Sequence, residues 1–152
     1  MRILGNILWY IPFCGFVTAL TAFFVGTLLT LTVVAAPIGL GLLQYAKFLL
    51  LPFSFEMMDK FELGRSTNPV WLAYSTIIML LYLPIGFVVM LVGIFQAVGL
   101  ALTIVGLPMA LVIAKSLGTF LNPVGKVCVP VDVKDALQRR RADAQADSLR
   151  YM

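Results

Sequence analysis

Two long stretches of almost uncharged sequence constrain the fold of this chain more than any other feature. Residues 3–55 contain a single charged residue, Lys47, and residues 69–121 also contain only one, Lys115. Over the whole chain 61% of the residues are hydrophobic and 12% are charged, whereas about a quarter are charged in a typical soluble domain. A chain of this composition cannot cover itself with polar side chains, so most of its surface must face lipid.

A helix needs about 20 apolar residues to cross the hydrocarbon core of a bilayer. Each block therefore has room for two crossings joined by a tight turn, and we expect an all-α membrane protein with four transmembrane helices. The expected spans are 7–25, 28–51, 70–92 and 98–121. A cleavable signal peptide is the alternative for the first span, but the hydrophobic stretch continues far beyond the apolar region of such a peptide.

The two blocks align with each other as copies of one unit. Residues 32–54 and 103–125 share six identical positions of 23, and each segment has two prolines fifteen residues apart. The paired prolines are Pro37 and Pro52 in the first copy, and Pro108 and Pro123 in the second. A repeat of about 71 residues therefore covers most of the chain.

The polar segments divide the chain into four parts. We expect a first membrane repeat at 1–55, a cytoplasmic or interfacial connection at 56–68, a second membrane repeat at 69–125 and a basic tail at 126–152. Over residues 52–68, which include this connection, Phe53, Met57 and Phe61 recur every fourth residue, which predicts a short helix lying in the membrane interface.

The tail is expected to start in an extended conformation at 126–131. Asp132 then looks like the N-cap of a cytoplasmic helix that ends near residue 149.

The first proline of each repeat predicts a bend. Pro37 and Pro108 would each remove a backbone donor inside a helix, and for Pro37 the carbonyl of Val33 would be freed, with Thr30 or Thr32 nearby to compensate. The alternative at Pro37 is a turn over residues 35–39, followed by a half-helix of about 21 Å. Pro12 and Pro84 are expected to kink their helices in the same way.

Small residues follow one face of the first span: Gly15, Ala19, Ala22 and Gly26. Such a face lets two helix backbones approach closely in lipid. It can serve packing within the chain or contact between copies, and packing within the chain is the preferred interpretation. Trp9 and Tyr10, just before this face, are expected to anchor the helix at the membrane interface.

The charged residues also predict the orientation in the membrane. Lysine and arginine flank the apolar blocks and are absent from the turns within them, so both termini and the 56–68 connection are expected on the cytoplasmic side. Both copies then deliver a charged segment to the same side, so each crosses an even number of times. The repeats should therefore be parallel, related by an axis along the membrane normal.

Several of these positions follow the pattern of one protein family. Its motif is a Thr/Ser-Ile-Ile-Gly-Ile-Pro-x-Gly run, a lysine seven residues after the proline, and Pro-x-Gly fifteen residues after it. Residues 103–108, Lys115 and 123–125 fit this pattern in the second repeat. In the first repeat Pro37, Gly39, Pro52 and Phe53 fit it, and the matching lysine is Lys47, ten residues after Pro37.

With these residues the chain resembles the YccF family of small bacterial inner-membrane proteins. Ala35, Ala36, Ser54 and Ala110 depart from the pattern, so helix packing is expected to differ in detail. The resemblance implies a multi-pass protein of the bacterial inner membrane. It implies no particular activity.

The composition gives no sign of an enzyme. The chain has no histidine, no carboxylate inside either apolar block and no cysteine cluster, so we expect no catalysis, no metal, no cofactor and no nucleic-acid partner. Glu56, Asp59 and Glu62 are interpreted as a solvated face, and a disulfide between Cys14 and Cys128 is not expected.

Two functions remain open. In the preferred one, the protein forms a homo-oligomer whose kinked helices surround a passage for ions or small solutes. Gln44 and Lys115 lie seven residues after the first proline of their repeats, and an ionisable group within a membrane helix is a functional candidate by default. Lys115 can also be a lysine that pairs with a carbonyl or extends to the interface. The candidate lining residues are Thr27, Thr30, Gln44, Thr103 and Lys115.

In the other hypothesis, the protein is a structural or accessory subunit of another membrane protein. In either case membrane lipids are expected partners. Arg139, Arg140 and Arg141 could bind anionic lipid headgroups, or they could serve only to keep the tail on the cytoplasmic side.

Overall fold

The computed structural model describes residues 2–13, 15–60, 62–64 and 68–150 of the chain, and this part is mostly helical. Our predictions for Cys14 and Phe61, and for Arg65 as one of the basic residues that flank the apolar blocks, lie outside it. Its elements, in chain order, are α1 (Arg2–Phe13), α2 (Gly15–Leu31), α3 (Ala36–Leu50), β1 (Phe55–Asp59), α4 (Pro69–Ala101), α5 (Leu107–Leu121), β2 (Lys126–Pro130) and α6 (Val131–Arg150).

The internal repeat is present in the arrangement of these elements. The bounds of α5 and β2 each fall 71 residues after the bounds of α3 and β1. Each repeat therefore consists of a helical hairpin followed by one strand: α2, α3 and β1 in the first, α4, α5 and β2 in the second.

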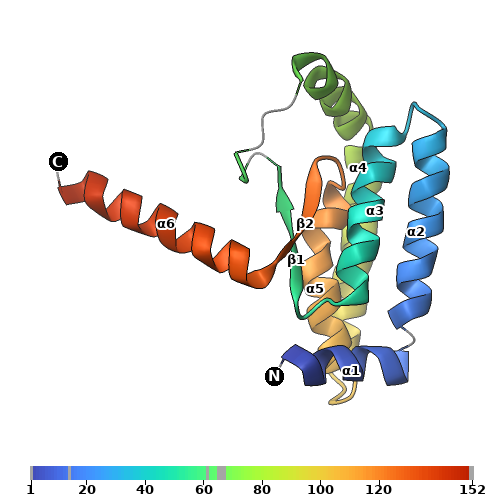
Figure 1. The fold of residues 1–152 in the computed structure, drawn as a ribbon. Helices are drawn as coiled ribbons and strands as arrows, with labels where there is room; N and C mark the ends of the chain where they lie inside the picture. Colours follow the sequence, from blue (N-terminus) through green and yellow to red (C-terminus); the bar gives the residue numbers. More distant parts are fainter. Residues whose placement is uncertain (1, 14, 61, 65–67, 151–152) are drawn as a thin grey trace.

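The two repeats run in opposite directions. β1 and β2 pair antiparallel, with Met57 opposite Cys128, and these two residues occupy the same position in their repeats. Figure 1 shows the α2–α3 turn at one end of the molecule and the α4–α5 turn at the other end. The repeats are thus related by an approximate two-fold axis that passes between Met57 and Cys128.

The predicted parallel arrangement is therefore wrong, and the strands are the reason. Residues 55–59 form β1 and not the predicted interfacial helix, because they pair with residues 126–130. A five-residue strand covers about 17 Å and leads the chain back along the hairpin. Each repeat consequently runs along the length of the molecule three times, twice as a helix and once as a strand. Because three is an odd number, the second repeat starts from the opposite end.

The helix bounds also differ from the four predicted spans. The first span is divided between α1 and α2, and the turn expected near residues 93–99 lies at 102–106, because α4 continues for 33 residues. Within the described residues, α4 is the one helix long and apolar enough to cross a membrane, whereas α2, α3 and α5 have 17, 15 and 15 residues.

Pro37 and Pro108 do not kink helices as predicted, because each lies in the first turn of α3 or α5. Proline is favoured there, since its missing donor has no partner in a first turn. The alternative interpretation, a turn followed by a short helix, is correct, although the turn lies at residues 32–35 and not at 35–39. The Tyr74 hydroxyl lies 2.8 Å from the Val33 carbonyl oxygen, while Thr30 bonds within its own helix.

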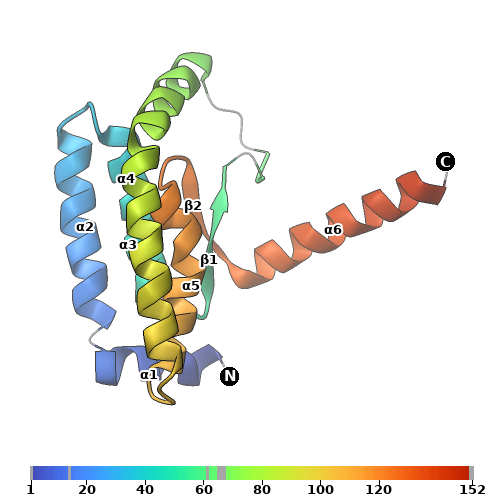
Figure 2. The same cartoon turned by 180° about the vertical axis from the view of Figure 1, so that it is seen from behind.

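α1 lies across one end of the hairpins, as Figures 1 and 2 show from opposite sides. Trp9 is buried and its indole N–H donates to the carbonyl of Leu49, while the Tyr10 hydroxyl donates to that of Leu50. These aromatic residues therefore bind the last carbonyls of α3, which lack partners within the helix. Their predicted position at the membrane interface stays a prediction.

The small-residue face of α2 packs within the chain, as preferred from the sequence. Gly15, Ala19 and Gly26 are buried, and a Cβ on Gly26 would lie 3.0 Å from the backbone nitrogen of Leu43 on α3. The core built on this contact contains Trp9, Ala19, Phe48, Leu49 and Val112.

The two-stranded sheet separates this core from α6. Phe55, Met57 and Cys128 face the helical core, and Met58, Val127 and Val129 form a second cluster on the other face with Leu63 and Leu137. Leu137 belongs to α6, which then extends away from the body (Figure 1). α6 begins at Val131, so Asp132 lies in its first turn and not at the predicted N-cap.

Oxidation should join a cysteine placed at Met57 to the native Cys128. The backbone bonds from Lys60 to Gly125 and from Val131 to Ser54 make the central pair a non-hydrogen-bonded one, with Cα atoms about 4.5 Å apart. We expect Met57→Cys, in a Cys14→Ser background, to form an intramolecular disulfide that mass spectrometry detects. Met58→Cys, on the other face of the sheet, is the control, and cross-linking there alone would contradict the register.

Gly41→Ala should destabilise the protein because the two repeats approach closely at Gly41. A Cβ there would lie 1.9 Å from the carbonyl oxygen of Pro123, at the end of α5. We expect a loss of about 1–3 kcal/mol or more, measured by thermal unfolding in detergent. Gly118→Ala is the matched control on α5, where a Cβ meets nothing within 4 Å, and it should leave stability unchanged or slightly raised. Equal losses would contradict the packing.

Candidate functional site

A row of polar side chains lies where α3 and α5 meet the two strands and the start of α6. We call this row the polar seam. Its members are Gln44, Tyr45, Glu56, Lys115, Ser116, Cys128 and Lys134.

The centre of the polar seam lies on the two-fold axis. The Tyr45 hydroxyl donates to Ser116 Oγ over 3.0 Å, and these residues are equivalent positions of the two repeats, 71 residues apart. Ser116 is fully buried and in turn donates to the carbonyl of Val112. A bond between equivalent positions can form only close to a symmetry axis, so this contact joins the repeats at their centre.

Gln44 and Lys115 occupy equivalent positions, and each reaches the strand of the other repeat. The Gln44 side-chain oxygen accepts the backbone N–H of Cys128 at 3.4 Å, a donor that the sheet leaves unpaired. Lys115 Nζ lies 3.4 Å from Glu56 Oε1 on β1 and 3.5 Å from the carbonyl oxygen of Pro52. The structure thus pairs Lys115 with a carbonyl and a carboxylate, which is the plainer of its two sequence interpretations.

Glu56 lies between two lysines. It forms an ion pair with Lys115 and a close one with Lys134 at the start of α6. Burial by itself raises the pKa of the Glu56 carboxyl, but the hydrogen bond from Lys134 and the charge of Lys115 together outweigh burial and lower that pKa. Glu56 is therefore ionised at neutral pH and connects α5, β1 and α6.

Three acids of the connection are paired in this way, which sequence reasoning missed. Asp59 bonds Lys126 at 3.0 Å, and Glu62 lies 3.6 Å from Arg141 on α6. Together with Glu56 they fasten the connection to the tail, so the interpretation as a solvated face is incomplete. The available signal was charge complementarity between the acidic 56–62 segment and the basic residues after 114.

The thiol of the polar seam is not activated. Burial raises the pKa of the Cys128 thiol to about 11, opposed in part by the charge of Lys47, so this thiol stays protonated and weakly nucleophilic at neutral pH. Within the described residues, no three histidine, cysteine or acidic side chains come together to hold a metal ion. What the arrangement can do is hold two repeats and α6 in one fixed geometry.

The five predicted lining residues are not brought together. Thr27 and Thr30 bond to carbonyls of their own helix α2, and Thr103 closes the α4–α5 turn at the far end of the molecule. Gln44 and Lys115 belong to the polar seam. Arg139, Arg140 and Arg141 lie exposed on α6, where Arg141 pairs with Glu62.

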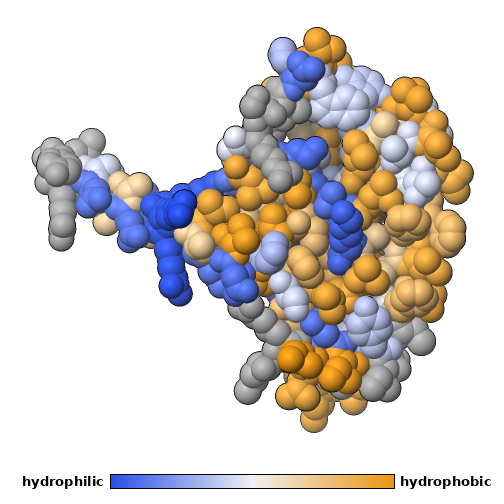
Figure 3. All heavy atoms as spheres, viewed as in Figure 1, coloured by the Kyte–Doolittle hydropathy of each residue, from blue (hydrophilic) through white to orange (hydrophobic). Residues whose placement is uncertain are grey.

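The surface is divided along the length of the hairpins. Figure 3 shows mostly hydrophobic side chains on the α2 side of the molecule, a mixture of hydrophobic and hydrophilic ones over the sheet, and mostly hydrophilic ones along α6. α2 and α4 contain no charged residue, although they expose large apolar side chains such as Phe16, Phe24 and Leu81. An exposed apolar surface of this extent is typical of a lipid-facing surface.

The comparison with known families agrees with the resemblance seen in the sequence. Residues 4–54 match the family model of YccF, described as an inner membrane component domain. The matched segment runs from α1 to the residue before β1, so it covers most of the first repeat. No curated protein and no solved structure matches the chain.

Glu56→Gln should destabilise the protein, because two lysines would lose their shared carboxylate. We expect a loss of about 1–3 kcal/mol, measured by thermal unfolding in detergent at pH 7. Glu62→Gln is the control: its pair with Arg141 has side chains 45% and 53% exposed, and such pairs contribute at most about 1 kcal/mol.

The ion pairs of Glu56 with the two lysines also predict that the stability of the protein depends on pH. Since the folded pKa of Glu56 is below its ordinary value of 4.5, its contribution is complete above about pH 4.5 and is lost as the pH falls through the lower folded pKa. The wild-type stability should approach that of Glu56→Gln below this window. A constant difference between the two proteins from pH 7 to pH 3 would contradict the assignment.

Proposed function

Because residues 4–54 match the inner membrane component domain of the YccF family, we propose that the protein is a structural component of the bacterial inner membrane. In this proposal it has no catalytic activity and needs no cofactor. Its charge-free helices α2 and α4 face lipid, and both termini lie on the cytoplasmic side with the sheet and α6. α6 then serves as an arm that binds another protein at the membrane surface.

The observation that carries this proposal is the isolation of α6. Its first turns are fastened to the sheet by Leu137 and by the pair of Lys134 with Glu56. Residues 138–149 are all exposed, and within the described part of the chain they contact the body through Arg141, which pairs with Glu62. A helix of 20 residues, about 30 Å long, that leaves the body after a rigid attachment is suited to contact a partner.

A passage for ions or small solutes through a homo-oligomer is the second candidate. One observation favours it: α3 presents Gln44 and Lys47 at an open pocket beside α2. The dispersed positions of the threonines and the pairing of Lys115 place it second. Ion flux into vesicles that contain only this protein, reduced by Lys47→Ala, would select it.

Removal of the arm tests the first candidate. Deletion of residues 139–152 keeps Leu137 and Lys134, so the shortened protein should insert into the membrane and melt at the same temperature. We expect native mass spectrometry of the full chain, purified from its own membranes in mild detergent, to show a complex of fixed stoichiometry that the shortened protein lacks. Arg139→Gln combined with Arg140→Gln serves as the control for charge alone.

Two results would contradict the proposal. The full chain could be monomeric and free of partners under conditions that preserve other membrane complexes. Alternatively, the complex could persist without residues 139–152, which would locate the contact on the helical body.

A further inference from the structure

We propose that a pocket between α2 and α3 binds one anionic phospholipid, with an acyl chain in its apolar part and the phosphate at its lysines. This inference is independent of the proposed arm, because α6 does not line the pocket. We call it the α2–α3 pocket, and its lining residues used below are Phe16, Leu20, Phe23, Leu43, Lys47, Lys60 and Lys126.

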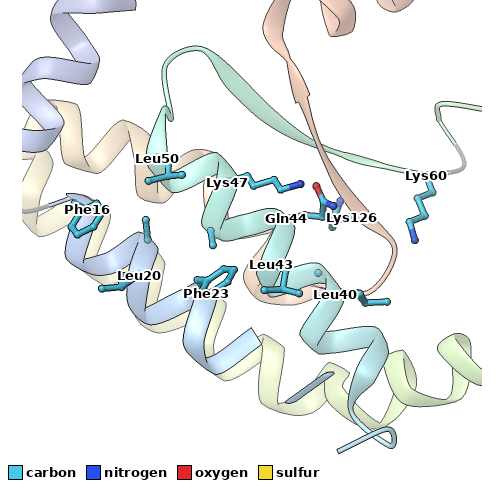
Figure 4. A pocket seen from close by; sticks show the side chains of 13 residues that line it. Phe16, Leu20, Phe23, Leu40, Leu43, Gln44, Lys47, Leu50, Lys60 and Lys126 are labelled. Atoms are coloured by element: carbon cyan, nitrogen blue, oxygen red, sulfur yellow. The ribbon is translucent and has the colours of Figure 1, made fainter. Parts of the chain in front are cut away.

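The apolar part of the α2–α3 pocket is a groove between two helices. Its volume is about 510 Å³, within the range of sites for small organic ligands. Figure 4 shows Leu20 and Phe23 of α2 on one side and Leu43 of α3 beside them. Phe16 and Phe23 are about half exposed, so the groove opens onto the lipid-facing surface of α2, from which an acyl chain can enter sideways.

The other part of the α2–α3 pocket is basic. Figure 4 shows Lys47 of α3 and Lys126 of β2 on either side of the side chain of Gln44, and Lys60 farther along the pocket beyond Lys126. Lys126 is paired with Asp59, but among the described residues neither Lys47 nor Lys60 forms an ion pair. Three ammonium groups and one nearby carboxylate leave an excess of positive charge, which attracts a phosphate.

The duplication does not explain these lysines. The positions equivalent to Lys47, Lys60 and Lys126 in the other repeat are Gly118, Val131 and Phe55, none of which is charged. The two repeats share their backbone arrangement, yet these three lysines occur at only one of the two equivalent places. Lys47 is also the single charge of its 53-residue apolar block.

Both chemistries together identify the ligand class. A free phosphate would use the lysines and leave the groove unfilled, and a neutral lipid would fill the groove and leave two ammonium groups unpaired. A phospholipid with a net negative headgroup satisfies both parts, and the long side chains of Lys47 and Lys60 can follow a headgroup at the interface.

The test is native mass spectrometry of the full protein in detergent with added lipid. We expect one phosphatidylglycerol to be retained in preference to phosphatidylcholine. Lys47→Gln combined with Lys60→Gln should weaken binding about tenfold or more, since both substitutions remove a positive charge that attracts the phosphate. Arg139→Gln combined with Arg140→Gln removes the same charge from α6 and should leave binding unchanged.

A second variant tests the apolar part. Leu20 is 41% exposed, so Leu20→Trp should be tolerated by the fold and should obstruct the groove. We expect an unchanged melting temperature without lipid and loss of the retained phosphatidylglycerol.

Three results would overturn the proposal. The first is equal retention of phosphatidylglycerol and phosphatidylcholine, and the second is an equal loss of binding in the α6 control. The third is retention of inorganic phosphate or of a simple fatty acid as strong as that of phosphatidylglycerol. Either result would show that the pocket recognises only one half of the proposed ligand.

Discussion

The antiparallel pairing of β1 with β2 determines how the two repeats meet. Both strands occupy the same place in their repeats, and Met57 lies opposite its own equivalent, Cys128. An antiparallel pair of equivalent strands has a two-fold axis at its centre, as an isologous interface between two subunits does. The helix before each strand must then run opposite to its counterpart, so α3 and α5 are antiparallel and the hairpin turns lie at opposite ends.

The polar seam follows from this symmetry, but equivalent residues within it make chemically different contacts. At the axis, Tyr45 and Ser116 differ in size but bond to each other, so one large and one small residue fill a space that two tyrosines could not share. Farther out, Gln44 accepts a backbone donor while Lys115 meets the carboxylate of Glu56. The equivalent positions of both repeats therefore make contacts across the axis, but these contacts differ in chemistry. The contact of Lys115 with Glu56 links the second repeat to α6, because Glu56 also pairs with Lys134.

Much of this fold could be predicted from the sequence, including the repeat, the apolar blocks and the extended segment at 126–131. The same repeat aligns residues 55–59 with 126–130, so an extended tail segment implied a strand in the connection as well. We predicted a helix there because Phe53 and Met57 suggested a helical period. That signal extends over too few residues to compete with strand pairing, which depends on a partner 71 residues away.

The errors in the helix bounds have a different cause. Proline inside an apolar stretch is compatible with a kinked helix or with the first turn of a new one, and composition does not distinguish them. Gly41 was likewise missed, because its role depends on a carbonyl of Pro123 from the other repeat. For the site residues, Gln44 and Lys115 were found because their spacing from proline repeats. Glu56 was not, since its partners lie on α5 and α6.

The strand at the end of each repeat also changes which orientation in the membrane the charged residues predict. The rule that positive residues stay in the cytoplasm counts lysine and arginine at the ends of membrane helices. Here Lys47 and Lys115 lie along the sides of α3 and α5, next to the sheet, while α2 and α4 carry no charge over their whole length. The charged residues therefore lie beside the hairpins and not at their ends. This arrangement favours the side of the sheet, rather than either hairpin turn, as the surface that faces water.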